Sequence, residues 1–576
     1  MKKEDLLHAS VIVIAGIAAY SNSFSCSLHF DDFPNIVSNP AITNLHDWRA
    51  WMLFNPSRPV AFFTFALNYH FNALDVPGYH LVNLLIHLLN ALLVWRIVLL
   101  IFRSQHLKDH PLAGFSRQIA FFTALLFVLH PLMTESVTYI VQRLVSLASL
   151  FCLLSILFFI KGILSDRPVS RYLYFLSSAI AAVLGFFTKE TSYSLPFLII
   201  LVYCFFYFRR MTLKRRSVMF LILLLFAVLS FLSFKALQSG KYFSPIPPRE
   251  GHPYIITPLK YYYTQVNVLI TYLRLIVLPI KQTLDYNYPM AESIWGLRIL
   301  IKLAILLAII ATAVRQFNRD RLLSFGIFWF FIAIAPQCLV PRSNFIFEHR
   351  TYLASIGIIL VWVLLFYYIF GRIRLLKLKG NTPAPLFITL AASLLFVQGI
   401  IFGRMTWERN KIWKDEYSLW SDCLLKAPGS ARALVNLGCE QVYRQEYPQA
   451  LKNFDQAILI FPLYFQAWNS RAAARINIGE NEKAVEELNF VIIQNPAFLD
   501  AYINRGIAFR NIKLFDAAIS DFTAALSISP NRSDTYFQRG LSFWMAGRNE
   551  AALTDVTQAA TMNNQDAIVF LQRNLR

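Results

Sequence analysis

The residues best suited to chemistry begin with an acidic pair, Asp31 and Asp32, which follows the first apolar run of the chain. Carboxylates near a membrane surface are ordinarily solvated or close a turn. A carboxylate in this position could instead serve as a general base, because a hydroxyl group is too weakly acidic to attack a sugar unaided. The pair could also hold a divalent cation such as Mg²⁺ or Mn²⁺, which prefers oxygen ligands, although nothing in the sequence requires one.

Three further clusters place charged side chains at the ends of apolar segments. They are His130, Glu135 and Arg143 in HPLMTESVTYIVQR, Lys189 and Glu190 in FFTKET, and Glu348, His349, Arg350 and Tyr352 in FEHRTYL. Charges at membrane depth are costly, so such residues are more often functional than their counterparts in soluble loops. The basic ones suit a phosphate or pyrophosphate leaving group, on which negative charge develops. The alternatives are helix ends with snorkelling side chains, and neighbours such as Lys189 and Glu190 that neutralise each other.

A fourth segment, LDYNYP, carries Asp285 and Tyr286, which could hold sugar hydroxyls or belong to an interfacial tyrosine belt. The sequence contains no P-loop, GxGxxG or HExxH motif, so a nucleotide-driven pump and a zinc protease have no support. The six cysteines show no CxxC spacing, which argues against structural zinc. Cys423 and Cys439 could be bridged in an oxidising compartment, but two unpaired thiols are the simpler interpretation.

The elements that must position these residues are membrane helices. Of the 576 residues, 56% are hydrophobic and only 15% are charged, which is too apolar for a soluble protein of this length. The formal charge of +21 does not indicate a nucleic-acid partner, because lysine and arginine gather in short loops between apolar runs. Segments long enough for a ~30 Å hydrocarbon core occur near 6–24, 80–102, 118–133, 144–163, 172–187, 192–208, 217–237, 264–280, 297–314, 322–340, 351–370 and 385–403.

The basic loops predict an orientation. Residues 209–216, 315–321 and 371–380 are the most basic and should be cytoplasmic. These three loops lie on the same side of the membrane only if segment 264–280, which carries Arg274, is a re-entrant or interfacial helix. The chain then crosses the membrane about eleven times. The first segment lacks a convincing cleavage site and is kept as a span. The N-terminus is then cytoplasmic, and the four clusters face the extracytoplasmic side.

A fixed period follows the last apolar segment. Pro428, Pro462, Pro496 and Pro530 are each 34 residues apart, and columns of small and aromatic residues keep the same step. This period predicts four tetratricopeptide repeats, at 431–464, 465–498, 499–532 and 533–566. We expect a membrane domain over 1–403, a connecting helix over 404–430 and a tail over 567–576.

In order and spacing, these segments resemble the transmembrane and tetratricopeptide repeat proteins, which include eukaryotic O-mannosyltransferases and bacterial homologues and look like members of the GT-C superfamily. The resemblance rests on the acidic pair, the four clusters, RNKIWKDEYSLW at 409–420 and the repeats. It implies an all-α chain, with a polytopic GT-C-like bundle followed by an α-solenoid, in a bacterial plasma membrane. It also implies an inverting glycosyltransferase that takes a sugar from a polyprenyl-phosphate donor, with a protein acceptor held by the extracytoplasmic repeats.

For single residues, the resemblance carries over only to Asp31 or Asp32, one of which would be the base. On charge and position, we assign Arg143, Lys189, His349 and Arg350 to the donor phosphate. The remaining candidates would orient those cations or bind sugar and acceptor: His130, Glu135, Glu190, Asp285, Tyr286, Glu348 and Tyr352. Three alternatives stay open, namely a glycan polymerase or ligase, a lipid-glycan transporter and a non-catalytic scaffold. Four repeats make a shorter array than in eukaryotic members, which leaves the acceptor open.

Overall fold

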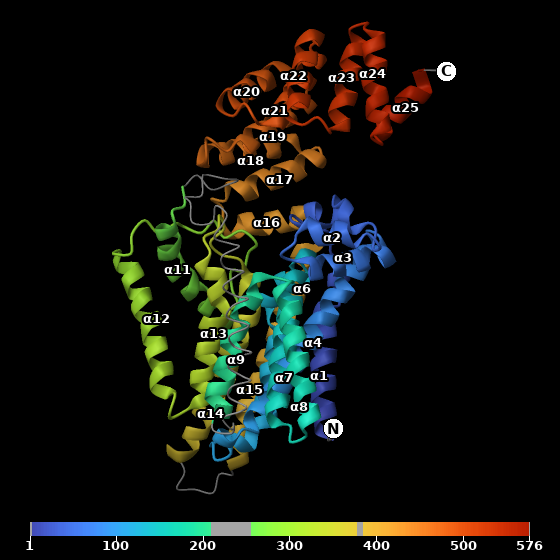
Figure 1. Cartoon of the computed structure of the whole chain (residues 1–576). Helices are drawn as coiled ribbons and strands as arrows, with labels where there is room; N and C mark the ends of the chain where they lie inside the picture. The colour runs from blue at the N-terminus through green and yellow to red at the C-terminus, as the bar shows by residue number, and fades with distance from the viewer. Residues whose placement is uncertain (1–2, 209–254, 377–383, 575–576) are drawn as a thin grey trace. The chain divides into compact units, whose positions relative to one another are not determined.

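The computed structural model describes residues 3–208, 255–376 and 384–574, and regular structure in these residues is helical throughout (Figure 1). This confirms the all-α prediction. The described chain divides into two units. The membrane unit holds nearly all described residues up to Asp422, and the repeat unit begins at Cys423.

Ten of the twelve predicted spans correspond to helices that are long and apolar enough to cross a bilayer. Nine of these are single helices within the described residues, and the tenth is a pair, Ala113–Leu129 and Pro131–Val137, bent by 51°. The predicted span at 217–237 lies outside the described residues. The helices are α1 (Lys3–Tyr20), α4 (Val76–Phe102), α5 (Ser116–Leu129), α7 (Arg143–Leu164), α8 (Pro168–Phe186), α9 (Leu195–Val202, continued to Tyr207), α12 (Leu297–Gln316), α13 (Arg321–Leu339), α14 (Tyr352–Leu376) and α15 (Ala384–Asn410).

Helix α11 (Pro258–Val277) covers the segment that the basic loops predict to be re-entrant or interfacial. Near its start, the Tyr261 hydroxyl donates to the Gln337 carbonyl at 3.1 Å. At its end, the Ile276 carbonyl accepts from His130 Nε2 at 2.8 Å. Both halves of α11 therefore contact the same end of the bundle, so the helix lies across that end and does not traverse the unit.

That end of the membrane unit gathers the loops that carry the predicted clusters (Figure 1). We call it the loop face, formed by residues 21–75, 130–142, 187–194, 255–296 and 340–351. It contains the short helices α2 (Trp48–Phe54), α3 (Pro59–Asn72) and α6 (Thr134–Val137). The alternation of the spans brings these stretches together, because every second connection returns to the same end.

Close packing fixes the start of α14, which carries one of the clusters. Gly326 on α13 and Gly357 on α14 face each other, and a Cβ on either residue would collide with the carbonyl oxygen of the other. Small residues allow membrane helices to approach to this degree. The Trp329 indole N–H also donates to the Leu353 carbonyl at 2.8 Å. These contacts leave residues 348–352 little freedom.

The repeat unit consists of paired helices, one pair in each predicted repeat. Gly438, Gly506 and Gly540 lie where the two helices of a pair meet, and a Cβ at Gly438 would come within 2.6 Å of the Phe454 ring. Cys423 and Cys439 are not bridged to each other by a disulfide. The pairs are α17 (Ala431–Tyr443) with α18 (Tyr447–Ile460), α19 (Phe465–Asn477) with α20 (Asn481–Gln494), α21 (Leu499–Asn511) with α22 (Phe515–Ile528), and α23 (Ser533–Met545) with α24 (Asn549–Thr561).

Two further helices flank the repeats. Helix α16 (Glu416–Lys426) falls within the predicted connecting segment. Helix α25 (Gln565–Asn574) occupies most of the predicted tail. It begins two residues earlier than the tail, because the fourth helix pair already ends at Thr561.

Candidate functional site

A cavity of about 160 Å³ at the loop face brings together four of the predicted residues, Asp31, Lys189, His349 and Arg350. Its walls come from several separate stretches of the chain, which no single sequence motif joins. The lining residues are Phe30, Asp31, Asn35, Arg58, Tyr139, Val141, Gln142, Leu144, Lys189, Arg342, Phe347, His349 and Arg350.

The cavity has a basic wall of four cations, Arg58, Lys189, Arg342 and Arg350. The stretches that carry Arg58 and Lys189 are joined by a backbone hydrogen bond from Val60 N–H to the Phe187 carbonyl, at 3.2 Å. Arg58 Nη2 also pairs with Glu190 Oε1 at 2.6 Å, and Lys189 Nζ donates to Gln142 Oε1 at 3.0 Å. Glu190 thus lies behind the wall and positions one of its arginines.

The other two members of the basic wall come from the loop before α14. Arg350 donates to the carbonyls of Asn344 and Phe345, both at 3.1 Å, and its guanidinium lies 5.2 Å from the centre of the Phe347 ring. Arg342 lines the cavity with no side-chain hydrogen bond to any described residue. Its guanidinium remains available to a ligand.

The basic wall carries more positive charge than the protein around it neutralises. Burial lowers the pKa of Lys189 well below its usual range, and the nearby Arg58, Arg342 and Arg350 lower it further, while Glu190 opposes them. Burial also lowers the pKa of Arg342. An anion in the cavity would relieve this repulsion, and phosphate, which accepts several charge-assisted hydrogen bonds, suits such a wall.

The two members of the acidic pair have different surroundings. Asp32 is fully buried, and its carboxylate accepts the N–H groups of Val141 at 2.7 Å and His29 at 2.9 Å. Burial raises the pKa of Asp32 to about 7, and these two donors oppose that shift. The Asp31 side chain is exposed and lines the cavity, and the Asp31 N–H donates to the Tyr139 hydroxyl at 2.8 Å. Asp32 braces the loop, and Asp31 faces the cavity.

These surroundings do not fit a divalent cation shared by the pair. Each carboxylate oxygen of Asp32 already accepts a backbone N–H. Across residues 3–208, 255–376 and 384–574, no group of three or more His, Cys, Asp or Glu side chains could hold a metal ion. Within the part of the chain that the structure describes, Asp31 is also the only carboxylate that lines the cavity.

His349 reaches the cavity from the first turn before α14 and is oriented by Glu135. Its Nδ1 lies 2.6 Å from Glu135 Oε1, and its backbone N–H donates to Glu135 Oε2 at 3.1 Å. The ring also stacks on Phe347 with centroids 5.1 Å apart. A carboxylate on one imidazole nitrogen fixes the tautomer and the ring orientation. Glu135 is therefore a positioning residue beneath the cavity.

Glu348 ties several elements of the loop face together. It accepts hydrogen bonds from Gln282 Nε2 at 2.9 Å, the Thr283 N–H at 2.9 Å, the Tyr286 hydroxyl at 2.6 Å and Arg409 Nη2 at 3.1 Å. Neither Glu348 nor Tyr286 lines the cavity. Both residues hold the segment after α11 against the start of α14 and the end of α15.

Three other candidates lie elsewhere in the membrane unit. His130 Nε2 bonds the Ile276 carbonyl, as described above, and therefore holds α11. The Tyr352 hydroxyl lies 2.6 Å from His87 Nδ1, among buried residues of the bundle. Asp285 accepts the Asn287 N–H at 3.2 Å within its own loop. The structure does not bring these three residues to the cavity.

Arg143 is also placed away from the cavity, although its charge led us to assign it to the donor phosphate. Its side chain is fully buried and donates to Asn83 Oδ1 at 2.6 Å, to the Tyr79 carbonyl at 3.1 Å and to the Thr64 carbonyl at 3.2 Å. The guanidinium also lies 4.7 Å from the centre of the Phe65 ring. These contacts join α3, α4 and α7, and Arg143 is not among the residues that line the cavity.

Comparisons with known proteins find relatives that match most of the chain. A family model described as tetratricopeptide repeat matches residues 435–489 and 474–533. Protein O-mannosyl-transferase F38B6.6 of Caenorhabditis elegans is 24% identical over 493 residues, which are 81% of this chain and 64% of that protein. Human protein O-mannosyl-transferase TMTC1 is 23% identical over 527 residues, 80% of this chain and 56% of that protein. Both relatives are named protein O-mannosyl-transferases, and this chain is similar to each of them over about four fifths of its length.

Other matches are more local. The Drosophila melanogaster protein O-mannosyl-transferase Tmtc3 is 36% identical over 182 residues, 28% of this chain and 20% of that protein. A solved structure of MamA from Desulfovibrio magneticus RS-1 is 18% identical over 26% of this chain and 83% of the other, with a TM-score of 0.24. The chain spans less than two thirds of the length of the curated relatives named here.

Arg58 and Arg342 were not among the candidates from sequence. A usable signal existed, because arginines concentrate in cytoplasmic loops and both residues fall in loops predicted to be extracytoplasmic. An arginine in an extracytoplasmic loop runs against this trend, and this indicates a local function.

Replacing Arg143 with methionine is expected to destabilise the protein. The change leaves two buried acceptors and one part-buried acceptor without their charged donor, so the free energy of unfolding should fall by about 3 kcal/mol or more. A lower Tm of the purified protein in detergent would show this loss. Arg167→Met, at an exposed position, is the matched control. An unchanged Tm with weakened donor binding would instead return Arg143 to the phosphate site.

Proposed function

We propose that the chain is an inverting membrane glycosyltransferase of the GT-C type, which transfers mannose or another hexose from a polyprenyl-phosphate donor to a protein hydroxyl. The names of its relatives support sugar transfer to protein. The observation that carries the proposal is the cavity at the loop face, where one exposed carboxylate, Asp31, shares a small space with four cations.

The basic wall would hold the donor phosphate. As the bond between the anomeric carbon and the phosphate oxygen breaks, its electron pair passes to that oxygen, and the developing charge lies against Arg58, Lys189, Arg342 and Arg350. Preorganised cations in a site of low dielectric stabilise such charge strongly. His349, held in place by Glu135, adds a polar ring edge to the same wall.

Asp31 would act as the base. It takes the proton of the Ser or Thr hydroxyl while the hydroxyl oxygen attacks the anomeric carbon from the face opposite the phosphate. A double displacement with retention would require a second carboxylate as nucleophile, as in retaining glycosidases. Among the described residues, Asp31 is the only carboxylate that lines the cavity, so we propose a single displacement with inversion.

The repeat unit would present the protein acceptor. Arrays of paired helices form extended concave surfaces that bind other polypeptides. The proposed acceptor is therefore a segment of protein with an accessible Ser or Thr.

Transfer can be measured in membranes that contain the chain, a polyprenyl-phosphate-linked mannose and Ser/Thr peptides, with mass spectrometry of the peptides. We expect one hexose on Ser or Thr. Donor binding without transfer would support the transporter alternative, movement of an intact oligosaccharide would support a polymerase or ligase, and absence of donor binding would support the scaffold.

The proposal also requires the loop face and the repeats to be extracytoplasmic in a bacterial plasma membrane. A reporter enzyme that is active only outside the cytoplasm, fused after the last repeat, is expected to be active. A reporter active only in the cytoplasm should be silent at the same junction. The opposite pattern would contradict both the orientation and the use of a donor at the outer face.

A further inference from the structure

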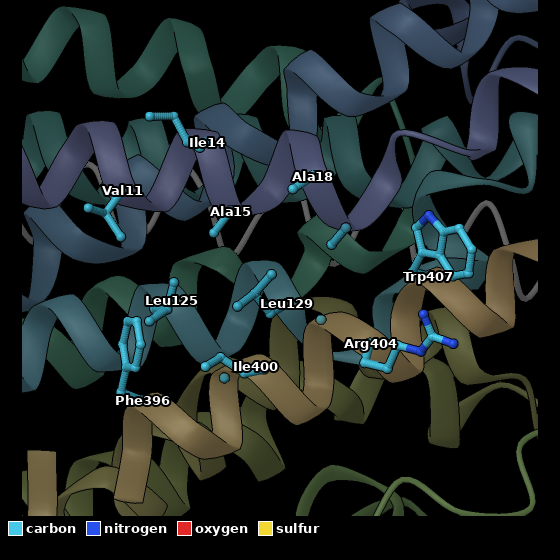
Figure 2. A pocket seen from close by; sticks show the side chains of 13 residues that line it. Val11, Ile14, Ala15, Ala18, Leu125, Leu129, Phe396, Ile400, Arg404 and Trp407 are labelled. Carbon is cyan, nitrogen blue, oxygen red and sulfur yellow. The ribbon is translucent and has the colours of Figure 1, made fainter. Parts of the chain in front are cut away.

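A second hollow in the membrane unit lies between α1, α5 and α15, separate from the residues of the proposed catalytic cavity. Its volume is about 570 Å³, and its walls are apolar except at one end, where Arg404 and Trp407 lie (Figure 2). Its rims carry Ile14, which is 65% exposed, and Ile400, which is 59% exposed. In a membrane this hollow would open to the bilayer. We call it the α1–α15 groove.

Small residues create the α1–α15 groove. Ala15 and Ala18 of α1 line one wall, and Gly399 and Gly403 of α15 line the other. A Cβ at Gly399 would lie 3.6 Å from Leu125, and a Cβ at Gly403 would lie 3.4 Å from Leu129. Because the two glycines have no side chains, Leu125 and Leu129 of α5 stay uncovered and form the floor of the groove.

The length of the groove distinguishes between two kinds of occupant. Its lining residues extend on α15 from Phe396 to Trp407, which at about 1.5 Å per residue is roughly 16 Å. One leaflet is about half of a ~30 Å hydrocarbon core. A partner helix that crossed the membrane would need a groove about twice as long. The dimensions fit one lipid chain in one leaflet.

The charged end of the groove indicates the lipid headgroup. Arg404, whose side chain is 68% exposed, and Lys411 both pair with the same carboxylate, Glu408, with the lysine contact at 2.8 Å. The two cations also flank the Trp407 ring, at 4.9 Å and 3.9 Å from its centre. Two cations on one carboxylate leave one positive charge, and tryptophan beside such cations is typical of the membrane interface.

We propose that the α1–α15 groove binds one anionic phospholipid, with an acyl chain on the leucine floor and its phosphate on Arg404 and Lys411. This lipid site is distinct from the donor site and does not depend on the proposed transfer reaction.

The test uses the full-length protein, purified in detergent, with palmitoyl-oleoyl phosphatidylglycerol as the probe and the matching phosphatidylcholine as its neutral counterpart. Native mass spectrometry counts the lipids retained. We expect one retained phosphatidylglycerol. Arg404→Gln should weaken its binding about fivefold, in line with the effect of one surface cation on an anionic lipid. The double change Ala15→Leu with Ala18→Leu should abolish binding, because it fills the groove with apolar side chains.

Arg298→Gln is the matched control, because Arg298 is an exposed arginine at the start of α12 on the loop face, away from the groove. It should leave lipid binding unchanged. The proposal is overturned if Arg298→Gln and Arg404→Gln weaken binding equally, or if phosphatidylcholine binds as well as phosphatidylglycerol. It is also overturned if polyprenyl phosphate displaces the bound lipid. Loss of a protein dimer, and not of a bound lipid, in the double variant Ala15→Leu with Ala18→Leu would overturn it as well.

Discussion

The Asp31→Asn protein is expected to fold normally and to lose sugar transfer by a factor of about 10²–10⁴, the usual contribution of general base catalysis. Asparagine has nearly the shape of aspartate, but its amide cannot take a proton from the acceptor hydroxyl. The Asp31 side chain is exposed at the cavity, so the change should not disturb packing. Transfer to a peptide acceptor, measured together with the Tm of the same preparation, separates the two effects.

Asp32→Asn is the matched control, because it makes the same chemical change one residue away. The amide nitrogen would meet a backbone N–H, from either His29 or Val141, where an oxygen now accepts. An unsatisfied buried donor costs about 1–3 kcal/mol, so the Tm should fall. If Asp32→Asn were stable but inactive while Asp31→Asn still transferred sugar, the roles of the two residues would be reversed.

Much of the fold could be predicted because its signals are local in the sequence. A membrane span requires only a long apolar segment, and the 34-residue spacing from Pro428 to Pro530 is visible without any tertiary information. The basic loops indicated that α11 is not a span. Counting its segment as a span would put these loops on opposite sides of the membrane. The 51° bend between Ala113–Leu129 and Pro131–Val137 is different. Its direction, which brings Glu135 to His349, depends on packing against other helices.

The site was harder to predict, because residue type does not determine which way a side chain points. Asp31 and Asp32 are chemically identical neighbours, yet one is exposed at the cavity and the other is buried against two N–H groups. Arg143 was assigned to the donor phosphate on charge and position, whereas Arg342, which does line the cavity, was not among the candidates. The polar groups of Asn83, Thr64 and Tyr79 surround Arg143, and no sequence pattern predicts such a buried arrangement.

Donor binding is expected to weaken as the pH rises through the pKa of Lys189. Burial and its cationic neighbours lower that pKa well below its usual range, so the ammonium loses its proton at a pH where an exposed lysine would keep it. The sugar phosphodiester keeps its charge over the same range. Affinity should therefore be strong below this pKa and decline above it, in a titration of donor Kd against pH.

Two variants test the assignment. In Lys189→Arg the pH-dependent decline should disappear, because arginine stays protonated at every accessible pH. Arg342→Gln removes a cation that lowers the pKa of Lys189, so the decline should move to higher pH. It also removes a phosphate contact, which should weaken affinity about tenfold or more, since a hydrogen bond to a charged group contributes ~1.5–3 kcal/mol. A decline that persisted unchanged in Lys189→Arg would identify another titrating group and would remove Lys189 from the donor site.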